Sequence, residues 1–159
     1  MKIPRTMKII LIIIFVGFVV QQIMSNEASK KTESPDYIVL KKYDSFEIRQ
    51  YPELILATTV MGNSYAGNSG NGFRTVAGYI FGGNESNEKI SMTSPVMVEM
   101  ADTVTMSFIM PSEYQLEKLP KPDNPKVKLH KENTKIVAVI KYGGYNNDSK
   151  MAAHRLKLK

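Results

Sequence analysis

Apolar and polar residues alternate with a period of two along much of the chain. Phe46 and Ile48 alternate with Glu47 and Arg49, which is the pattern of a strand with one buried face. Pro52 interrupts this run, and a β-branched, apolar stretch follows it. The pattern predicts strands over residues 37–42, 46–51, 54–61, 95–101, 104–110, 127–131 and 135–142.

One segment between the strands follows a helical period instead. Its apolar residues are spaced as i, i+3, i+4 and i+7, which places them on one face: Phe73, Val76, Ala77 and Ile80. The spacing predicts a helix over residues 71–81, ended by two glycines and preceded by a Gly-, Asn- and Ser-rich loop over 63–72. Residues 147–149 (NDS) are typical of the cap of a second, C-terminal helix. We therefore expect the α+β class, with more strand than helix.

The second half of the chain repeats the pattern of the first half at an offset of 81 residues. The aligned positions are residues 46–48 (FEI) with 127–129 (VKL), Ala57 with Ala138, and Gly62 with Gly143. Either a unit is duplicated, or two alternating strand pairs agree by chance. A duplicated unit predicts a second helix near residues 152–162 and two strands after it. On that interpretation the chain is truncated at its C-terminus and leaves sheet edges unpaired.

The N-terminus carries half of the formal net charge of +6. Residues 1–25 contain three basic residues and no acidic one, and residues 9–20 are uninterruptedly apolar. A basic start before an apolar run of about 7–15 residues is typical of a secretory signal. An uncleaved membrane anchor or a buried helix fits the same run. We expect a signal peptide or anchor over 1–25, a polar linker over 26–36, and a domain over 37–159 that is secreted, periplasmic or membrane-anchored.

The composition excludes several kinds of chemistry. The chain has no cysteine, which excludes disulfides, thiol nucleophiles and iron–sulfur clusters. After residue 25, its 18 basic and 15 acidic residues are interleaved, so no nucleic-acid surface is expected. No P-loop, H-E-x-x-H pattern or nucleophile–base constellation is present. Of the two histidines, His130 falls on the polar side of a strand, and His154 in the terminal helix is a weak candidate for a metal ligand.

Several segments, taken in order, resemble the SOUL heme-binding family. They are residues 43–52 (YDSFEIRQYP), 72–84 (GFRTVAGYIFGGN), 89–96 (KISMTSPV), 106–112 (MSFIMPS) and 137–145 (VAVIKYGGY). The resemblance extends from about residue 38 to residue 154, which is most of the expected domain. It implies a distorted antiparallel β-barrel, built from a duplicated βαββ-type unit and flanked by two helices, of which the closing strands are missing here.

The same resemblance implies noncovalent binding of heme or another tetrapyrrole, without catalysis, at an apolar surface beside the first helix. Carried over by position, residues 71–81 form one wall of the site. Arg74 lies off the apolar face and is the candidate for pairing with a propionate, because a guanidinium binds carboxylates bidentately. Gly78 and Tyr79 are expected on the same outer side, against the ring. The alternatives are a binding module for other small hydrophobic effectors and a tetrapyrrole-modifying enzyme.

Overall fold

The computed structural model describes residues 12–18 and 32–158, and the chain divides into two units, Met1–Thr32 and Glu33–Lys159. In the first unit, residues 12–18 are helical. No helix within these described ranges is long and apolar enough to cross a bilayer. The rest of the expected leader and most of the linker, residues 1–11 and 19–31, lie outside the described residues, so the signal or anchor stays a prediction.

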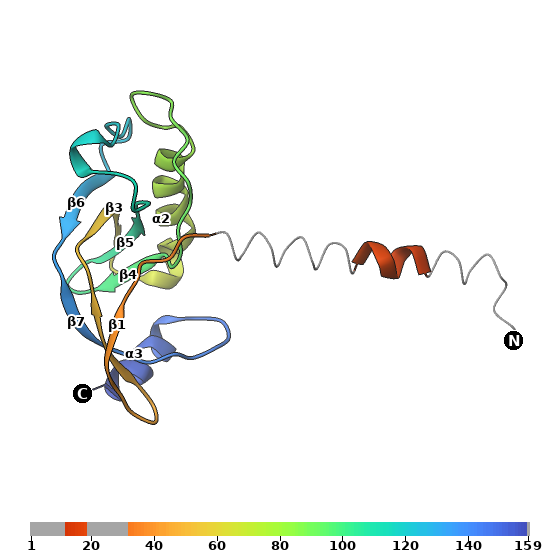
Figure 1. Ribbon diagram of the computed structural model, residues 1–159, viewed down its shortest axis with the longest axis vertical. Helices are drawn as coiled ribbons and strands as arrows, with labels where there is room; N and C mark the ends of the chain where they lie inside the picture. Colours follow the sequence, from red (N-terminus) through yellow and green to blue (C-terminus); the bar gives the residue numbers. More distant parts are fainter. Residues whose placement is uncertain (1–11, 19–31, 159) are drawn as a thin grey trace, which may run out of the picture. The chain divides into compact units, whose positions relative to one another are not determined.

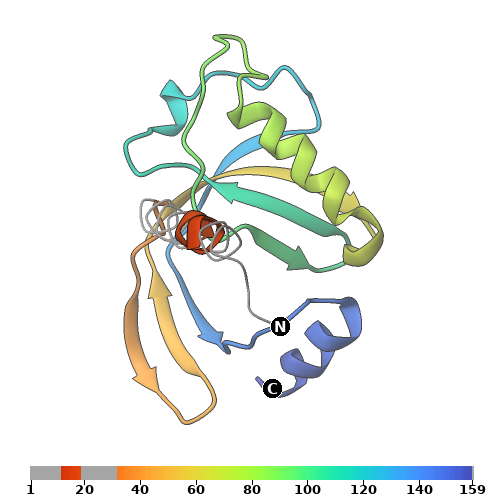
Figure 2. The same ribbon diagram turned by 90° about the vertical axis from the view of Figure 1, so that its right-hand side faces the viewer.

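The second unit contains two antiparallel sheets, which Figure 1 and Figure 2 show from two sides. One sheet has the order β1-β2-β7, and its strands are β1 (Ile38–Lys42), β2 (Glu47–Tyr51) and β7 (Lys135–Val139). The other has the order β4-β5-β3-β6, and its strands are β4 (Met97–Met100), β5 (Val104–Ile109), β3 (Leu54–Gly62) and β6 (Lys128–Glu132). The helical elements are α2 (Tyr65–Ile80), the 3₁₀ helix η1 (Leu116–Lys118) and α3 (Asp148–Leu156). The expected α+β class is confirmed, but the strands of residues 32–158 form two separate sheets and no closed barrel.

Helix α2 begins earlier than its hydrophobic pattern predicts. It starts at Tyr65, so the prediction of a loop over residues 63–72 is wrong for most of that segment. Ser64 caps the helix by accepting a hydrogen bond from the backbone N–H of Gly67. A Cβ at Gly72 would lie 2.5 Å from Sδ of Met61, so glycine there allows the helix to approach β3. Each glycine inside a helix costs about 1 kcal/mol of stability relative to alanine, and the cap together with this close packing outweighs that cost.

The pairing of the strands repeats the offset of 81 residues found in the sequence. Residues 54–58 of β3 pair with residues 132–128 of β6, and residues 51–47 of β2 pair with residues 135–139 of β7. Both sets of pairs belong to one antiparallel register, in which residues 54–58 and residues 135–139, 81 positions later, occupy equivalent places. The consecutive strands β2 and β3 therefore pair with the consecutive strands β7 and β6, and the pairing passes from one sheet to the other at residues 52–53 and 133–134.

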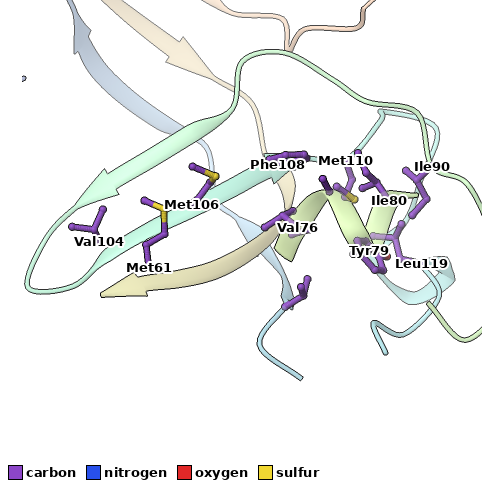
Figure 3. Packing of buried hydrophobic residues seen from close by; sticks show 13 residues of the cluster. Met61, Val76, Tyr79, Ile80, Ile90, Val104, Met106, Phe108, Met110 and Leu119 are labelled. Carbon is purple, nitrogen blue, oxygen red and sulfur yellow. The ribbon is translucent and has the colours of Figure 1, made fainter. Parts of the chain in front are cut away.

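The core lies between α2 and one face of the four-stranded sheet, as Figure 3 shows. Val76, Tyr79 and Ile80 of α2 are each at most 1% exposed. Opposite them, Ala57 of β3 and Phe108 of β5 form a cross-strand pair whose side chains are 0% and 2% exposed. Flexible methionines of β3 and β5 fill the space around this pair. One face of this sheet is thus fully used for packing.

The corresponding face of the three-stranded sheet is not covered. Ala138 and Ile136 of β7 lie 81 residues after Ala57 and Ile55, yet Ala138 is exposed and Ile136 is 63% exposed. Helix α3 follows β7 as α2 follows β3, but its Arg155 reaches toward β4 through a 3.5 Å hydrogen bond from Nη1 to the carbonyl of Met100. In the described part of the chain, α2 therefore covers one face of the four-stranded sheet, whereas the equivalent face of the three-stranded sheet has no such cover.

This difference predicts opposite responses to one substitution at two equivalent positions. Ala57→Leu overpacks the core beneath α2 and is expected to lower the free energy of unfolding by about 1–3 kcal/mol. Ala138→Leu adds its side chain to an open surface, and a change within about 0.5 kcal/mol is expected. Urea unfolding of both variants measures the two values, and equal losses would contradict the description of the two faces.

Candidate functional site

The outer face of α2 is an open strip poor in side chains. Gly67, Gly70, Asn71, Arg74 and Gly78 follow one another at helical spacing, and all five are exposed. A Cβ built at Gly70 or Gly78 meets nothing within 4 Å. We call these five residues the glycine strip. Because most of its members lack side chains, a flat molecule can approach the helix backbone closely there.

Arg74 is the charged group of the glycine strip, where the sequence places it. Its Nη2 donates a 2.6 Å hydrogen bond to Oδ1 of Asn71, one turn earlier. Asn71 is neutral, and none of the ion pairs between described residues involves Arg74. The guanidinium is therefore oriented along the strip while its charge is not neutralised, which suits an anionic ligand.

Phe81 extends the strip at the C-terminal end of the helix. It lies seven residues after Arg74 and three after Gly78, and it is 59% exposed. The sequence prediction included it only as the last residue of the wall over residues 71–81 and gave it no contact of its own, although the same helical spacing places it next to Gly78. An exposed aromatic ring beside a glycine offers an apolar contact for a ligand ring.

Tyr79 does not lie on the outer side of α2, so that part of the sequence prediction is wrong. Its side chain is 1% exposed, and its hydroxyl donates a 3.0 Å hydrogen bond to the carbonyl of Pro120. Burial raises the pKa of Tyr79 to about 12. Tyr79 lies three residues after Val76, so it shares the core face of the helix, and the Pro120 carbonyl allows its polar end to be buried there.

A buried asparagine fixes the end of α2 and thereby the position of Phe81. Asn84 is 1% exposed, and its Nδ2 donates to the carbonyls of Tyr79 and Glu88 at 3.0 and 2.8 Å. Its Oδ1 accepts from the backbone N–H of Glu88 at 3.0 Å. At Gly83, a Cβ would lie 2.7 Å from the carbonyl of Gly78, so only glycine allows this tight return. The Gly-Gly-Asn sequence after the helical pattern is the signal for this arrangement.

The weak metal candidate, His154, is not brought to the glycine strip. It lies on α3, and its ring stacks on Tyr142 with centroids 3.8 Å apart and planes 10° apart. Its Nδ1 is buried without a hydrogen-bond partner. Within the described ranges, no group of three His, Cys, Asp or Glu residues is placed to hold a metal ion. No described histidine therefore lies on the glycine strip. The strip offers a ligand an open helix backbone and the positive charge of Arg74.

One comparison with known proteins identifies a family. The sequence model of the family described as SOUL heme-binding protein matches residues 32–159. This match begins beside Glu33, where the second unit starts, and it includes α2 and the whole glycine strip. A comparison with curated proteins found no match.

The buried position of Tyr79 predicts how its removal acts. Tyr79→Phe leaves the Pro120 carbonyl without its donor and is expected to lower the free energy of unfolding at pH 8 by about 1–3 kcal/mol. Because the folded pKa lies above the ordinary value, this tyrosine stabilises the fold fully below pH 10, and its contribution is lost as the pH rises toward 12. The stability difference between the two proteins should therefore shrink above pH 10.

Urea unfolding at pH 8 and at pH 10.5 measures this difference. Tyr145→Phe is the control, because Tyr145 is fully exposed and its replacement is expected to change stability little. A Tyr79→Phe variant with unchanged stability at pH 8 would contradict the buried hydrogen bond.

Proposed function

The chain belongs to the SOUL heme-binding protein family, and from this premise we propose that it binds heme or another tetrapyrrole noncovalently, without catalysing a reaction. The observation that carries the proposal is the guanidinium of Arg74 within the glycine strip, which forms no ion pair with another described residue. Family membership supplies the ligand class, and the strip supplies a surface of suitable shape and charge.

The residues of the strip fit the two chemical parts of a tetrapyrrole. Arg74 would pair with a propionate, since a guanidinium offers two parallel N–H donors to a carboxylate. The macrocycle would lie over the open positions at Gly70 and Gly78, with Phe81 in contact at one edge. Such contacts hold the ring by removing apolar surface from water, and they require no bond to iron.

The charge of the strip also distinguishes between ligand classes. A binding module for other small hydrophobic effectors is the alternative function, and Arg74 favours anionic effectors over cationic ones. Heme carries two carboxylates and meets this requirement. A hydrophobic cation is expected not to compete for the strip, because it would be repelled by the guanidinium.

We further propose that residues 1–25 deliver the domain across or onto a membrane. The support is the basic start and the apolar run of residues 9–20 in the sequence. N-terminal sequencing of the protein isolated from its host distinguishes a cleaved signal from a retained anchor.

Titration with hemin, followed by the Soret band, tests the binding proposal. We expect a shifted band at micromolar protein and an affinity that falls about 10-fold to 100-fold in Arg74→Ala, because hydrogen bonds to charged groups contribute about 1.5–3 kcal/mol. Lys126→Ala removes another exposed cation outside the strip and is the matched control with unchanged affinity. Absence of a Soret shift in the parent protein would contradict the proposal.

Gly78→Leu tests the shape of the strip in the same titration. A Cβ at this position meets no neighbour within 4 Å, and leucine improves helix propensity by about 1 kcal/mol, so the fold is expected to be retained. Its side chain would cover the strip, and hemin affinity is expected to fall about 10-fold or more. If Gly78→Leu and Arg74→Ala both bind hemin like the parent, the ligand lies elsewhere.

A further inference from the structure

Residues 82–88 turn back toward α2 and bring Lys89 to the C-terminal end of the glycine strip. Phe81 and Lys89 are partners in an isolated antiparallel bridge, and the backbone N–H of Ile90 donates a 2.8 Å hydrogen bond to the carbonyl of Ile80. Residues directly opposite each other in such a bridge direct their side chains to the same side. Because Phe81 and Lys89 are both exposed, the Lys89 side chain leaves the backbone beside the ring of Phe81.

The backbone on both sides of Lys89 is held in place. Before it, the Asn84 amide donates to the carbonyl of Glu88 at 2.8 Å and accepts from the N–H of Glu88 at 3.0 Å. After it, Ile90 is 2% exposed and packs in the core near Ile80, as Figure 3 shows. Lys89 therefore starts from a fixed point at the end of the strip, and its side chain extends into solvent.

The positive charge of Lys89 is not neutralised by the acidic residues of the same turn. Oε1 of Glu88 accepts a 2.5 Å hydrogen bond from the hydroxyl of Tyr114, and Oε1 of Glu85 accepts a 3.2 Å hydrogen bond from the backbone N–H of Lys121. None of the ion pairs formed within residues 32–158 involves Lys89. The ammonium group is therefore available to an anionic ligand.

Helix α2 provides no positive charge of its own at this end. Its last turn contains no basic residue. The C-terminus of a helix carries a partial negative charge, which disfavours a carboxylate nearby, and the full charge of Lys89 outweighs it. The strip thus has two cations, Arg74 within it and Lys89 at its end, and Gly78 lies between them.

The spacing of the two cations matches the size of a tetrapyrrole. Arg74 lies seven residues before Phe81, which is about 10 Å along the helix axis, and Lys89 extends from beside Phe81. This span is comparable to the width of a porphyrin macrocycle. A ring that lies over Gly78 would therefore have Arg74 at one edge and Lys89 at the opposite edge.

Heme would pair with one of the two cations in this arrangement. Its two propionates lie on one edge of the ring, and the opposite edge carries two vinyl groups. With the propionates at Arg74, the vinyl edge would face Lys89 and leave the ammonium group without a carboxylate. A tetrapyrrole with carboxylates on both edges would pair with both cations.

We propose that the glycine strip prefers tetrapyrroles with carboxylates on two opposite edges, one edge pairing with Arg74 and the other with Lys89. This inference rests on the proposed tetrapyrrole site and names the class of ligand that the site selects. Arg74 can bind a carboxylate bidentately, whereas Lys89 acts as a point charge. Lys89 therefore contributes selectivity more than affinity.

Parallel titrations of the full chain with hemin and with iron(III) coproporphyrin III, followed by the Soret band, test this preference. The two ligands share the iron, the macrocycle and one propionate edge, and in coproporphyrin III propionates replace the two vinyl groups. We expect the full chain to bind iron(III) coproporphyrin III about 3-fold to 5-fold more tightly than hemin, since an exposed ion pair contributes modestly. The preference should shrink in about 0.5 M NaCl, because salt screens exposed charges.

Lys89→Ala separates this pairing from general affinity for the ring. We expect the variant to lose the preference, while its affinity for hemin stays within about 2-fold of that of the parent protein. Lys89→Arg keeps the charge and should keep the preference. Lys126→Ala removes an exposed cation outside the strip and is the control, in which the preference is unchanged. Thermal unfolding checks that each variant is folded.

The possible outcomes distinguish this inference from the proposed function. Equal affinity of the parent protein for the two ligands would overturn the preference and leave the tetrapyrrole site standing. A preference that persists in Lys89→Ala would overturn the role given to Lys89. Absence of a Soret shift with both ligands would overturn the tetrapyrrole site itself and the preference with it.

Discussion

The antiparallel pairing of the β2–β3 segment with the β6–β7 segment is the constraint on which the described domain depends. Each segment contributes one strand to each sheet, in the same register. A slip of one residue would turn every side chain of a strand to the opposite face, so the register decides which residues enter the core. The starts of the two helices are also joined, because Ser64, before α2, donates a 3.2 Å hydrogen bond to Asp148 at the start of α3.

The two halves share this strand register but differ in what packs against their strands, and the exposed surfaces of the domain follow from that difference. In the first half, α2 packs on the four-stranded sheet through Val76, Tyr79 and Ile80. The opposite face of the helix is exposed and carries Arg74 and the glycines of the strip. In the second half, β7 has a neighbour on one side, and its valines line a groove instead of meeting a strand. The exposed outer face of α2 and the uncovered face of the three-stranded sheet are distinct consequences of one arrangement.

Residues whose role is decided locally were predictable from the sequence, and residues decided by packing were not. The alternation of Phe46 to Tyr51 located β2, and Asn147 was identified as part of the α3 cap. The start of α2 was missed because its glycines favour a loop until Ser64 and Met61 are placed beside them. Tyr79 was assigned to the wrong side although its spacing of three residues from Val76 indicates the core face, and the Pro120 carbonyl that accepts from its hydroxyl could not be located from the sequence. The distorted barrel that the resemblance implied depends on pairing between strands far apart in the sequence, which local pattern does not reveal, and the described strands form two sheets.

The central claim is that, among the described strands, β3 pairs on both sides whereas β7 pairs on one side, with β2. Amide hydrogen exchange of the protein without ligand tests it most directly, by comparing residues 54–58 of β3 with residues 135–139 of β7. We expect every β3 amide from Leu56 to Thr58 to be protected, because β5 and β6 pair with the two sides of these residues. In β7 we expect protection at alternate residues only, those that bond to β2. Uniform protection of residues 135–139 in the monomer would contradict the account.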